Sequence, residues 1–436
     1  MDTLISAGIV LALLLGFLGL GVWVFASLGL VAFCALFFLH GMDPMRIGTI
    51  AASIVARYAA SWELSAIPMF IWMGEIIFRT DISARLFRGL SPFVDYIPGR
   101  LLHTNVLGCT LFAAVSGSSP ATTATVGRIT TGELARRGYD PAITLGSLAG
   151  AGSLGLLIPP SIVMIVYGIL AGQSVSRLFA AGVVPGLMIA GLYSGYIALR
   201  AWKDPTLVPQ DRPRHGPAEF GRALVDLVPL MALMVIVLGS IYSGIATPSE
   251  AAAVGVVAAI AVTALTGQFS LQLMRQTLMG ALRTSAMVSS ILIAAALMST
   301  TMGYLHIPAD VAAAIAGLEL PPWALLIVLS LFYLGLGFFL DGNSIVVMSL
   351  PIALPLALQA GFDPIWFGIY LVLMIEMAQV TPPVGFNLFV LQGISGRPIG
   401  EVARAAFPFF LLMLLGVLLL ALFPGIALWL PDLLYG

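Results

Sequence analysis

Charged residues are scarce in this sequence of 436 residues: they make up 9% of it, whereas an ordinary soluble domain carries about 25%. Hydrophobic residues make up 60%, and the mean hydropathy is +1.06. Apolar runs long enough to cross about 30 Å of hydrocarbon recur along almost the whole chain. The composition therefore excludes an ordinary soluble protein and predicts an all-α polytopic membrane protein.

Lysine and cysteine are nearly absent. Of the 19 basic residues only Lys203 is a lysine, and neither a polybasic tail nor a nucleic-acid patch is present. The two cysteines, Cys34 and Cys109, lie within apolar segments, which favours small core residues over a disulfide or a metal site. The N-terminus lacks the charged region and the cleavage site of a signal peptide, so we expect it to be retained as the first span.

About ten segments are apolar and long enough to cross the membrane as helices. The predicted spans are 4–20, 22–39, 64–80, 141–172, 178–201, 223–246, 249–266, 284–304, 364–394 and 405–430. Shorter segments that mix charged and apolar residues are expected to lie along the interface. These are 41–62, 82–98, 268–282 and 306–318.

Two further apolar stretches, 101–136 and 320–360, are interrupted by the polar clusters SGSSP (116–120) and LDGNS (340–344). A spanning helix should be most apolar at these points. Irregular backbone at membrane depth survives only where protein or a wet cavity satisfies it. We therefore predict two re-entrant helical hairpins that turn at these clusters.

The arginine distribution supports two hairpins that do not cross. If the basic connection 199–222 is cytoplasmic, the parity of crossings places most other basic residues on the same side. These residues are Arg85, Arg88, Arg100, Arg136, Arg137, Arg275, Arg283, Arg397 and Arg404. Only Arg46, Arg57 and Arg177 fall outside, and both termini are predicted to lie outside as well.

An internal repeat relates the two halves of the chain at an offset of 223 residues. The matching positions are Asp140-Pro141 with Asp363-Pro364, Pro159-Pro160 with Pro382-Pro383, and Pro185 with Pro408. Asp at the N-cap and Pro at the first helical position restart a helix, whereas Pro-Pro breaks one. An odd number of crossings separates the halves, so the second is inverted. Inverted repeats with broken helices are the architecture of secondary transporters.

Oxygen atoms gather at both predicted breaks. Freed carbonyls and hydroxyl groups can bind a hard monovalent cation without a full charge. The candidate residues of the first site are Ser116, Gly117, Ser118, Ser119, Gly155 and Pro159. Those of the second are Asp341, Gly342, Asn343, Thr381 and Pro382. We predict two quasi-equivalent cation sites.

Structural roles compete with these assignments. Ser and Thr hydroxyls in membrane helices also bond to carbonyls of the preceding turn, and Asp341 could simply cap the returning hairpin limb. Glu376, Gln379 and Asn387 lie beside the second break, where packing or hydrogen bonding also accounts for them. Glu250 with Thr247 forms the sequence of a capping box, for which a structural role is expected.

Two other functional classes share some of these features. An intramembrane hydrolase is disfavoured because VSGSSP is not the nucleophile elbow G-x-S-x-G. A passive channel also uses broken helices and polar tips, and concentration of substrate against its gradient would separate it from a transporter.

Several motifs together resemble one family. AAVSGSSPATTATVG, GSLGLLIPPS, GIATPSEAAAVG, FFLDGNS and VTPPVGFNLFV are similar to segments of the large membrane subunit of tripartite ATP-independent periplasmic (TRAP) transporters, the DctM-like group of the ion-transporter superfamily. The resemblance runs over nearly the entire chain. An in-class rival is a divalent-anion:sodium symporter that works alone, against which GIATPSEAAA favours the tripartite family.

The resemblance implies a sodium-coupled elevator importer of the bacterial inner membrane, with Na⁺ as coupling ion and no enzymatic activity. The implied partners are a small four-helix membrane subunit and a periplasmic binding protein. This protein would deliver an organic acid such as a C4-dicarboxylate or sialic acid. Proton coupling stays open. The resemblance adds Gly337 to the sodium candidates and Pro160, Gly385 and Asn387 as substrate candidates.

The implied domains are alternating scaffold and transport segments. Scaffold covers 1–98 and 177–318, the transport repeats cover 99–176 and 319–396, and 397–436 forms a C-terminal helix. The substrate is not announced by an arginine at the hairpin tips. Arg128 lies about three helical turns from the first tip at 1.5 Å per residue, which we expect to be too far for it to reach the tip.

Overall fold

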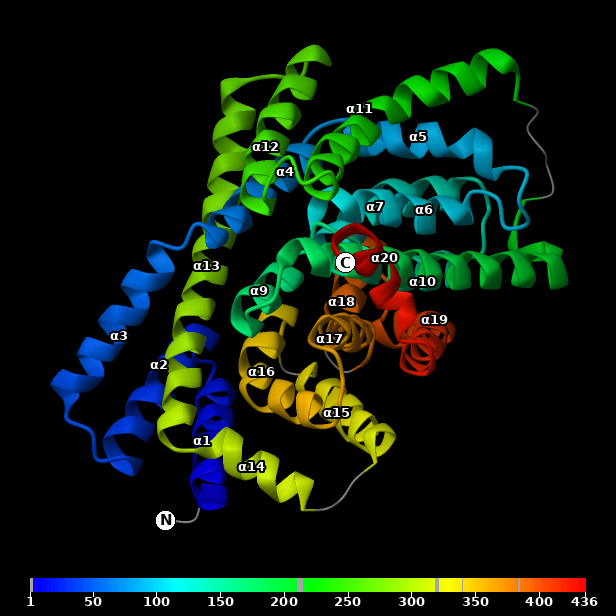
Figure 1. Ribbon diagram of the computed structural model, residues 1–436. Helices are drawn as coiled ribbons and strands as arrows, with labels where there is room; N and C mark the ends of the chain where they lie inside the picture. The colour runs from blue at the N-terminus through cyan, green and yellow to red at the C-terminus, as the bar shows by residue number, and fades with distance from the viewer. Residues whose placement is uncertain (1–2, 210–214, 318–320, 339, 383–384) are drawn as a thin grey trace.

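The computed structural model describes residues 3–209, 215–317, 321–338, 340–382 and 385–436, and these residues form helices and no strand. Figure 1 shows the helices in chain order. The all-α polytopic architecture predicted from composition is confirmed. Its main landmarks are the two hairpins and the two interrupted helices, which occupy corresponding places in the two repeats.

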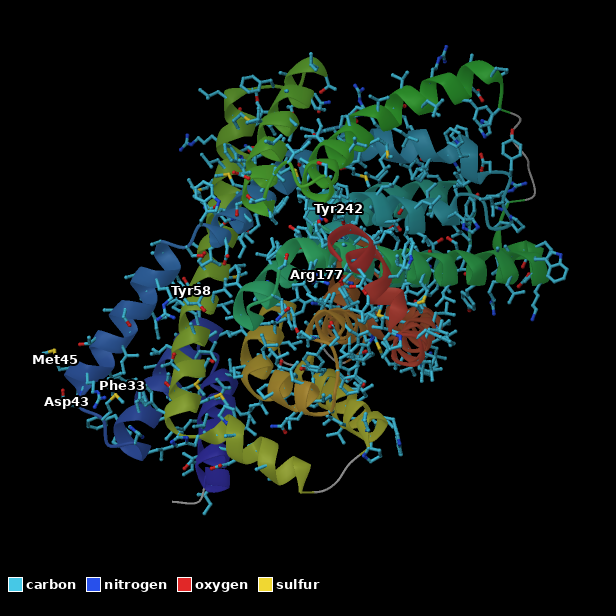
Figure 2. All side chains as sticks on the ribbon, in the orientation of Figure 1. Phe33, Asp43, Met45, Tyr58, Arg177 and Tyr242 are labelled. Carbon is cyan, nitrogen blue, oxygen red and sulfur yellow. The ribbon has the colours of Figure 1, made fainter. Side chains whose placement is uncertain are left out.

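One side of the molecule is built around a single long helix, α13, with the N-terminal helices packed against it (Figure 1). The elements of this side are α1 (Thr3–Gly19), α2 (Val24–Cys34) with its π-helical continuation Ala35–Leu39, α3 (Pro44–Ala59), α13 (Leu271–Tyr304) and α14 (Ile307–Ala316). Figure 2 shows Asp43 and Met45 at the outer end of α3. Met45 is 79% exposed, and the Asp43 side chain caps α3 by accepting from the Met45 N–H at 2.9 Å.

A second group surrounds the first hairpin. It consists of the 3₁₀ turn Glu63–Ser65, α4 (Ala66–Phe78), α5 (Ile82–Val94), α11 (Pro217–Tyr242) and α12 (Pro248–Leu265). Helices α5 and α11 pack along each other, joined by Arg88 with Asp226 at 3.6 Å and by the ring contact of Phe93 with Phe220. Thr247 and Glu250 form the predicted capping box at the start of α12. Its structural role is therefore confirmed.

The first repeat comprises a hairpin and a broken helix. Its elements are α6 (Leu102–Ser116), α7 (Ser119–Arg136), α8 (Pro141–Gly152), the 3₁₀ turn Ser153–Gly155 and α9 (Ile162–Ala171), followed by α10 (Val175–Lys203) and the 3₁₀ turn Pro205–Leu207. Asp140 caps α8 by accepting from the Ile143 N–H at 3.0 Å, with Pro141 at the first helical position. The predicted helix start and the predicted break before α9 are both present.

The second repeat has the same order. Its elements are α15 (Pro322–Leu336), α16 (Gly342–Gln359), α17 (Pro364–Gln379) and α18 (Phe386–Ser395), followed by α19 (Ile399–Leu422) and α20 (Gly425–Tyr435). Asp363 accepts from the N–H groups of Ile365 and Trp366 at 2.8 and 3.0 Å. The matched prolines Pro185 and Pro408 both lie inside the helix after a broken one, α10 and α19. Pro383 of the second Pro-Pro pair lies outside the described residues.

Two predicted boundaries are wrong. Segments 268–282 and 284–304 form one helix, α13, because no proline separates them and helix formation continues through the polar residues around Arg283. At 1.5 Å per residue this 34-residue helix is about 51 Å long, longer than the hydrocarbon is thick. The span 405–430 is interrupted at Phe423 and Pro424, where α19 ends before α20 begins, because proline cannot continue the backbone ladder.

Six of the described helices are long and apolar enough to cross a membrane: α10, α11, α12, α13, α16 and α19. Helix α16 is the returning limb of the second hairpin, so its length alone does not make it a crossing. The predicted span 64–80 contains α4, which has 13 residues and is shorter than the roughly 20 that a perpendicular crossing needs. The two broken helices reach a spanning length only as pairs.

His215 precedes α11, outside the candidate membrane-spanning helices, and links α11 to the end of α5. Its Nε2 lies 2.6 Å from Asp95 Oδ2 at the end of α5, and its Nδ1 lies 2.8 Å from Glu219 Oε2. Both ring nitrogens can donate only when the imidazole is protonated. The hydrogen bond to Asp95, and then that to Glu219, raises the pKa of His215 despite its partial burial.

We predict that His215→Gln destabilises the protein at low pH. Because the folded-state pKa is raised, the contribution of His215 is complete below the ordinary value of about 6.5 and is lost as the pH rises through the raised value. The apparent Tm in detergent should fall by about 1–2 °C near pH 5.5 and by less near pH 9. Arg397→Gln, which removes an exposed pair with Glu401, should act equally at both pH values. Equal losses for His215→Gln would contradict the assignment.

Candidate functional site

The first hairpin turns at two residues, Gly117 and Ser118. Gly117 has φ +59°, a left-handed conformation that favours glycine, and Ser118 is extended at the start of α7. The Ser116 Oγ lies 2.7 Å from the Thr122 Oγ1, which donates to the Ser118 carbonyl at 2.8 Å. The Ser118 hydroxyl itself has no hydrogen-bond partner among the described residues.

The first helix break closes tightly around this tip. A Cβ on Gly155 would lie 2.6 Å from Ser119 Cα and 2.7 Å from the Ser118 carbonyl oxygen. A Cβ on Gly117 would lie 2.8 Å from the Pro160 carbonyl oxygen. Pro159 is buried in the same irregular segment, residues 156–161. The predicted facing of the serine cluster by the first break is therefore present.

Ser119 is the meeting point of four elements. Its Oγ lies 2.8 Å from the Gly152 carbonyl at the end of α8 and 2.8 Å from Glu376 Oε2 on α17. The Asn387 Nδ2 of α18 donates to the same oxygen at 3.0 Å. A hydroxyl carries one proton, so it donates to either Gly152 or Glu376 at a given moment. Ser119 is fully buried, and we refer to it with Glu376 and Asn387 as the repeat junction.

Glu376 connects the second repeat to the first break. It is 0% exposed, and its Oε1 accepts from the Leu156 N–H at 2.8 Å. One carboxylate thus satisfies a backbone amide freed by the break and a hydroxyl at the hairpin tip. Glu376 and Asn387 have the hydrogen-bonding role that the sequence allowed for them, but the sequence did not identify Ser119 as their partner. The one sign of this site in the sequence is an ionisable residue deep in an apolar helix, which is functional by default.

The second hairpin tip is capped by its own carboxylate. Asp341 accepts from the Asn343 N–H at 3.2 Å and from the Ser344 hydroxyl, so it caps α16. A Cβ on Gly337 would overlap the Ala378 side chain of α17, and one on Gly342 would lie 2.9 Å from Ile375. Both glycines permit close packing of the hairpin on α17.

The second break is a short turn after α17. The Thr381 Oγ1 donates to the Met377 carbonyl at 2.6 Å. This is the hydrogen bond to the preceding helical turn that competes with a cation-binding role for a membrane hydroxyl. The Gly385 N–H donates to the Thr381 carbonyl at 3.1 Å, and a Cβ there would lie 2.6 Å from the Gln379 carbonyl oxygen. Pro382 is exposed.

A cavity of about 760 Å³ lies between the two hairpin tips and helices α2, α4 and α13, and we call it the central cavity. Five predicted sodium residues line it: Ser116, Ser118, Asp341, Gly342 and Asn343. Its other polar lining residues include Gln379, Glu75 on α4 and Thr284 on α13. The buried Asn343 Oδ1 and Gln379 Oε1 have no hydrogen-bond partner in the described structure. Two amide oxygens are thus left available beside the cavity.

The remaining predicted residues lie behind this lining. Gly117, Ser119, Gly155, Pro159, Gly337, Thr381 and Pro382 are not among the lining residues, and neither are the substrate candidates Pro160, Gly385 and Asn387. Most of them shape the tips and the breaks through the contacts given above. Whether any predicted residue binds sodium or substrate stays a prediction.

The central cavity is lined mostly by apolar side chains, with a few polar groups at the hairpin tips and on α4, α13 and α17. Its described lining includes the carboxylates of Glu75 and Asp341 and no lysine, arginine or histidine. The described residues contain no group of three or more His, Cys, Asp or Glu side chains that could hold a metal ion. The carboxylate, amide and hydroxyl oxygens among its polar residues suit a hard cation better than a transition metal.

Comparisons with known proteins agree with this arrangement. The family described as "Tripartite ATP-independent periplasmic transporter, DctM component" matches residues 11–426. The chain is 38% identical to the C4-dicarboxylate TRAP transporter large permease protein DctM of Pseudomonas aeruginosa, over 85% of this chain and 86% of the relative. It is 34% identical to the protein of the same name from Rhodobacter capsulatus, over 100% of both.

Two further comparisons bear on substrate range and on fold. The chain is 34% identical to the ectoine/5-hydroxyectoine TRAP transporter large permease protein UehC of Ruegeria pomeroyi, over 92% of this chain and 93% of the relative. The solved structure of the Alcanivorax borkumensis YdaH transporter is 16% identical, with a TM-score of 0.62 over 89% of this chain and 91% of that one. At this identity the likeness concerns the fold alone.

We predict that Gly155→Ala loosens the fit between the first break and the hairpin tip. The added Cβ would meet backbone atoms of Ser118 and Ser119, and overpacking of this kind costs about 1–3 kcal/mol. Thermal unfolding in detergent should show a lower apparent Tm. The matched control is Gly132→Ala on α7, where a Cβ meets no atom within 4 Å and helix propensity favours alanine. Equal stability of the two variants would contradict the close fit.

We predict that Glu376→Leu is among the most destabilising substitutions in the second repeat. It leaves the buried Leu156 N–H without its acceptor, at a cost of about 1–3 kcal/mol, whereas the Ser119 hydroxyl keeps the Gly152 carbonyl as an acceptor. Unfolding titrated with sodium dodecyl sulfate measures the loss. Gln379→Met is the control, because the Gln379 Oε1 has no partner to lose. A Glu376→Leu protein as stable as this control would show that the junction contributes nothing.

Proposed function

Because the chain belongs to the DctM component family of tripartite ATP-independent periplasmic transporters, we propose that it imports an organic anion across the bacterial inner membrane, driven by sodium. Because the chain belongs to this family, it is not assigned to the stand-alone divalent-anion:sodium symporters. Membership also favours a transporter subunit over an enzyme or a channel. The observation that carries the proposal is the central cavity, into which both hairpin tips project.

Sodium coupling is supported by the chemistry of the two tips. Ser118, whose hydroxyl has no partner in the described structure, and Asn343, whose buried Oδ1 has none, both line the central cavity, one from each hairpin. Carbonyl, amide, hydroxyl and carboxylate oxygens are the ligands that hard cations take. In this proposal Na⁺ is held by Ser116, Ser118, Asp341 and Asn343, with backbone oxygens at the breaks completing the sites.

An elevator mechanism is supported by which elements contribute to the cavity. One wall consists of hairpin and broken-helix residues, and the opposite wall consists of α2, α4 and α13 residues such as Phe25, Ile71 and Val288. In this proposal 99–176 and 319–396 move together as the transport domain. The other segments, 1–98 and 177–318, form the scaffold, with 397–436 following the second repeat.

The substrate and partners are proposed from the relatives. The Pseudomonas and Rhodobacter proteins are C4-dicarboxylate permeases by name, and the Ruegeria protein is an ectoine permease. We propose a C4-dicarboxylate as the first substrate to test; sialic acid stays a prediction from the resemblance. The proposed partners are a small four-helix membrane subunit and a periplasmic binding protein, with both termini in the periplasm.

The test is uptake of radiolabelled succinate into proteoliposomes that contain the chain and both partners. We expect accumulation under an inward sodium gradient. Ser118→Ala and Asn343→Ala should each raise the sodium concentration for half-maximal uptake by roughly tenfold, equivalent to about 1.4 kcal/mol for one lost ligand. Ser290→Ala on α13 is the control, because its hydroxyl only bonds to the Ala286 carbonyl at 2.7 Å.

Two outcomes would contradict the proposal. Undiminished uptake without a sodium gradient would remove the coupling, and a proton gradient that drives uptake in its place would identify the ion. Equal sodium dependence of wild type, Ser118→Ala and Asn343→Ala would exclude the tips as the cation site.

A further inference from the structure

Arg128 lies where α7 and α18 form a second hollow, lined by Ala124, Arg128, Phe389, Val390, Gly393 and Ile394. The hollow has a volume of about 620 Å³, and we call it the side cavity. A Cβ on Gly393 would meet no atom within 4 Å, so this wall is open. Phe389 is 45% exposed beside it.

Arg128 is a cation without a carboxylate in the described structure. None of the ion pairs there includes it, whereas Arg136 at the end of α7 and Arg137 directly after it both pair with Glu133. Its guanidinium carbon lies 5.6 Å from the ring centroid of Phe78 on α4. A cation–π contact of this kind leaves the N–H donors at the guanidinium edge free for an anion.

The side cavity adjoins the central cavity. Ala124 lines both, and Phe78, which holds Arg128, lines the central cavity. Ala121, Ala124 and Arg128 follow one another at spacings of three and four residues, so they share one face of α7. This face runs from the first hairpin tip to the arginine with small side chains between them.

Charge distinguishes the two cavities. The central cavity carries the carboxylates Glu75 and Asp341 and no cation among its described lining residues, whereas the side cavity carries one arginine and no described acidic residue. Glu75 pairs with Arg79 at 2.9 Å, so Asp341 is the carboxylate of this lining that has no ion pair in the described structure. A carboxylate leaving the tips along α7 therefore moves away from the Asp341 carboxylate and toward an unpaired guanidinium. A bidentate Arg–carboxylate pair is a strong, directional contact.

We propose that Arg128 and the side cavity form a second binding station for the carboxylate of the transported anion, reached from the central cavity along the Ala121–Ala124 face of α7. That the ligand of this second binding station is the transported anion rests on the proposed function. It is separate from the sodium residues at the tips, so the two can fail independently. The sequence placed Arg128 too far from the tip to bind there, and in this proposal it binds at a second position.

The experiment places a thiol between the two cavities. Ala124→Cys is made with Cys34→Ser in the full chain with its membrane partner subunit, and buried Cys109 is retained as the unreactive background. A sulfonate methanethiosulfonate and a trimethylammonium methanethiosulfonate are compared as anionic and cationic probes. We expect the ratio of anionic to cationic modification rates to fall roughly tenfold when Arg128→Gln is added, because one charge about one helical turn away is removed. Arg128→Lys should retain most of the preference.

The outcomes separate the inference from the proposed function. An unchanged ratio in Arg128→Gln, or no modification by either probe, would overturn the station whatever the substrate is. Gly393→Leu, which fills the side cavity and keeps the charge, should slow both probes. Protection of the thiol by succinate in wild type, lost in Arg128→Gln, is the expected result with a transport ligand. Succinate protection that Arg128→Gln leaves unchanged would also overturn the station, while sodium-dependent uptake tests the tips alone.

Discussion

The hydrogen bond between Ser119 and Glu376 is the contact on which the arrangement of the two repeats depends. It joins a hairpin tip of the first repeat to the broken helix of the second, 257 residues apart in the chain, in a site where neither side chain is exposed to solvent. Glu376 also accepts the Leu156 N–H released by the first break, so the same carboxylate satisfies both irregular segments. Without a partner of this kind, freed polar groups at membrane depth would carry a cost of several kcal/mol.

The packing of the helices also connects each repeat to the other. The first arm of each broken helix contacts its own hairpin, α8 with α6 and α17 with α15, whereas the second arm contacts the hairpin of the other repeat, α18 with α7 and α9 with α16. Gly127 on α7 therefore faces Leu391 and Ile394 on α18, and Gly342 faces Val163 on α9. Because each hairpin is held by both repeats, the two tips keep a fixed relation, and the central cavity is a property of the pair.

Helix starts, helix breaks and caps could be predicted from neighbouring residues in the sequence, whereas the repeat junction could not. Asp140 and Asp363 follow the helix-start rule, the Pro-Pro pairs break helices, and Glu250 completes a capping box, all from residues within a turn of one another. The partner of Ser119 depends on which helices meet in space, and a repeat offset relates equivalent positions without specifying contacts between different ones. The errors at α13 and α20 have the opposite origin: helix propensity carried the chain through the polar residues near Arg283, and Pro424 ended a helix inside an apolar run.

The repeats are similar in backbone and different in charge. The first tip carries hydroxyl groups, and the Ser118 hydroxyl makes no capping hydrogen bond to α7. The second tip carries Asp341, whose carboxylate caps α16, and Asp341 also lines the central cavity. The other lining carboxylate, Glu75, pairs with Arg79 at 2.9 Å, whereas Asp341 has no ion pair in the described structure. A carboxylate substrate approaching Asp341 is repelled, and a cation bound at the tips offsets that repulsion, more strongly here than in water because the surroundings are less polar. Under the proposed function, electrostatics therefore favours an order in which sodium binds before the anion, and the coupling of the two follows from the charge of the cavity itself.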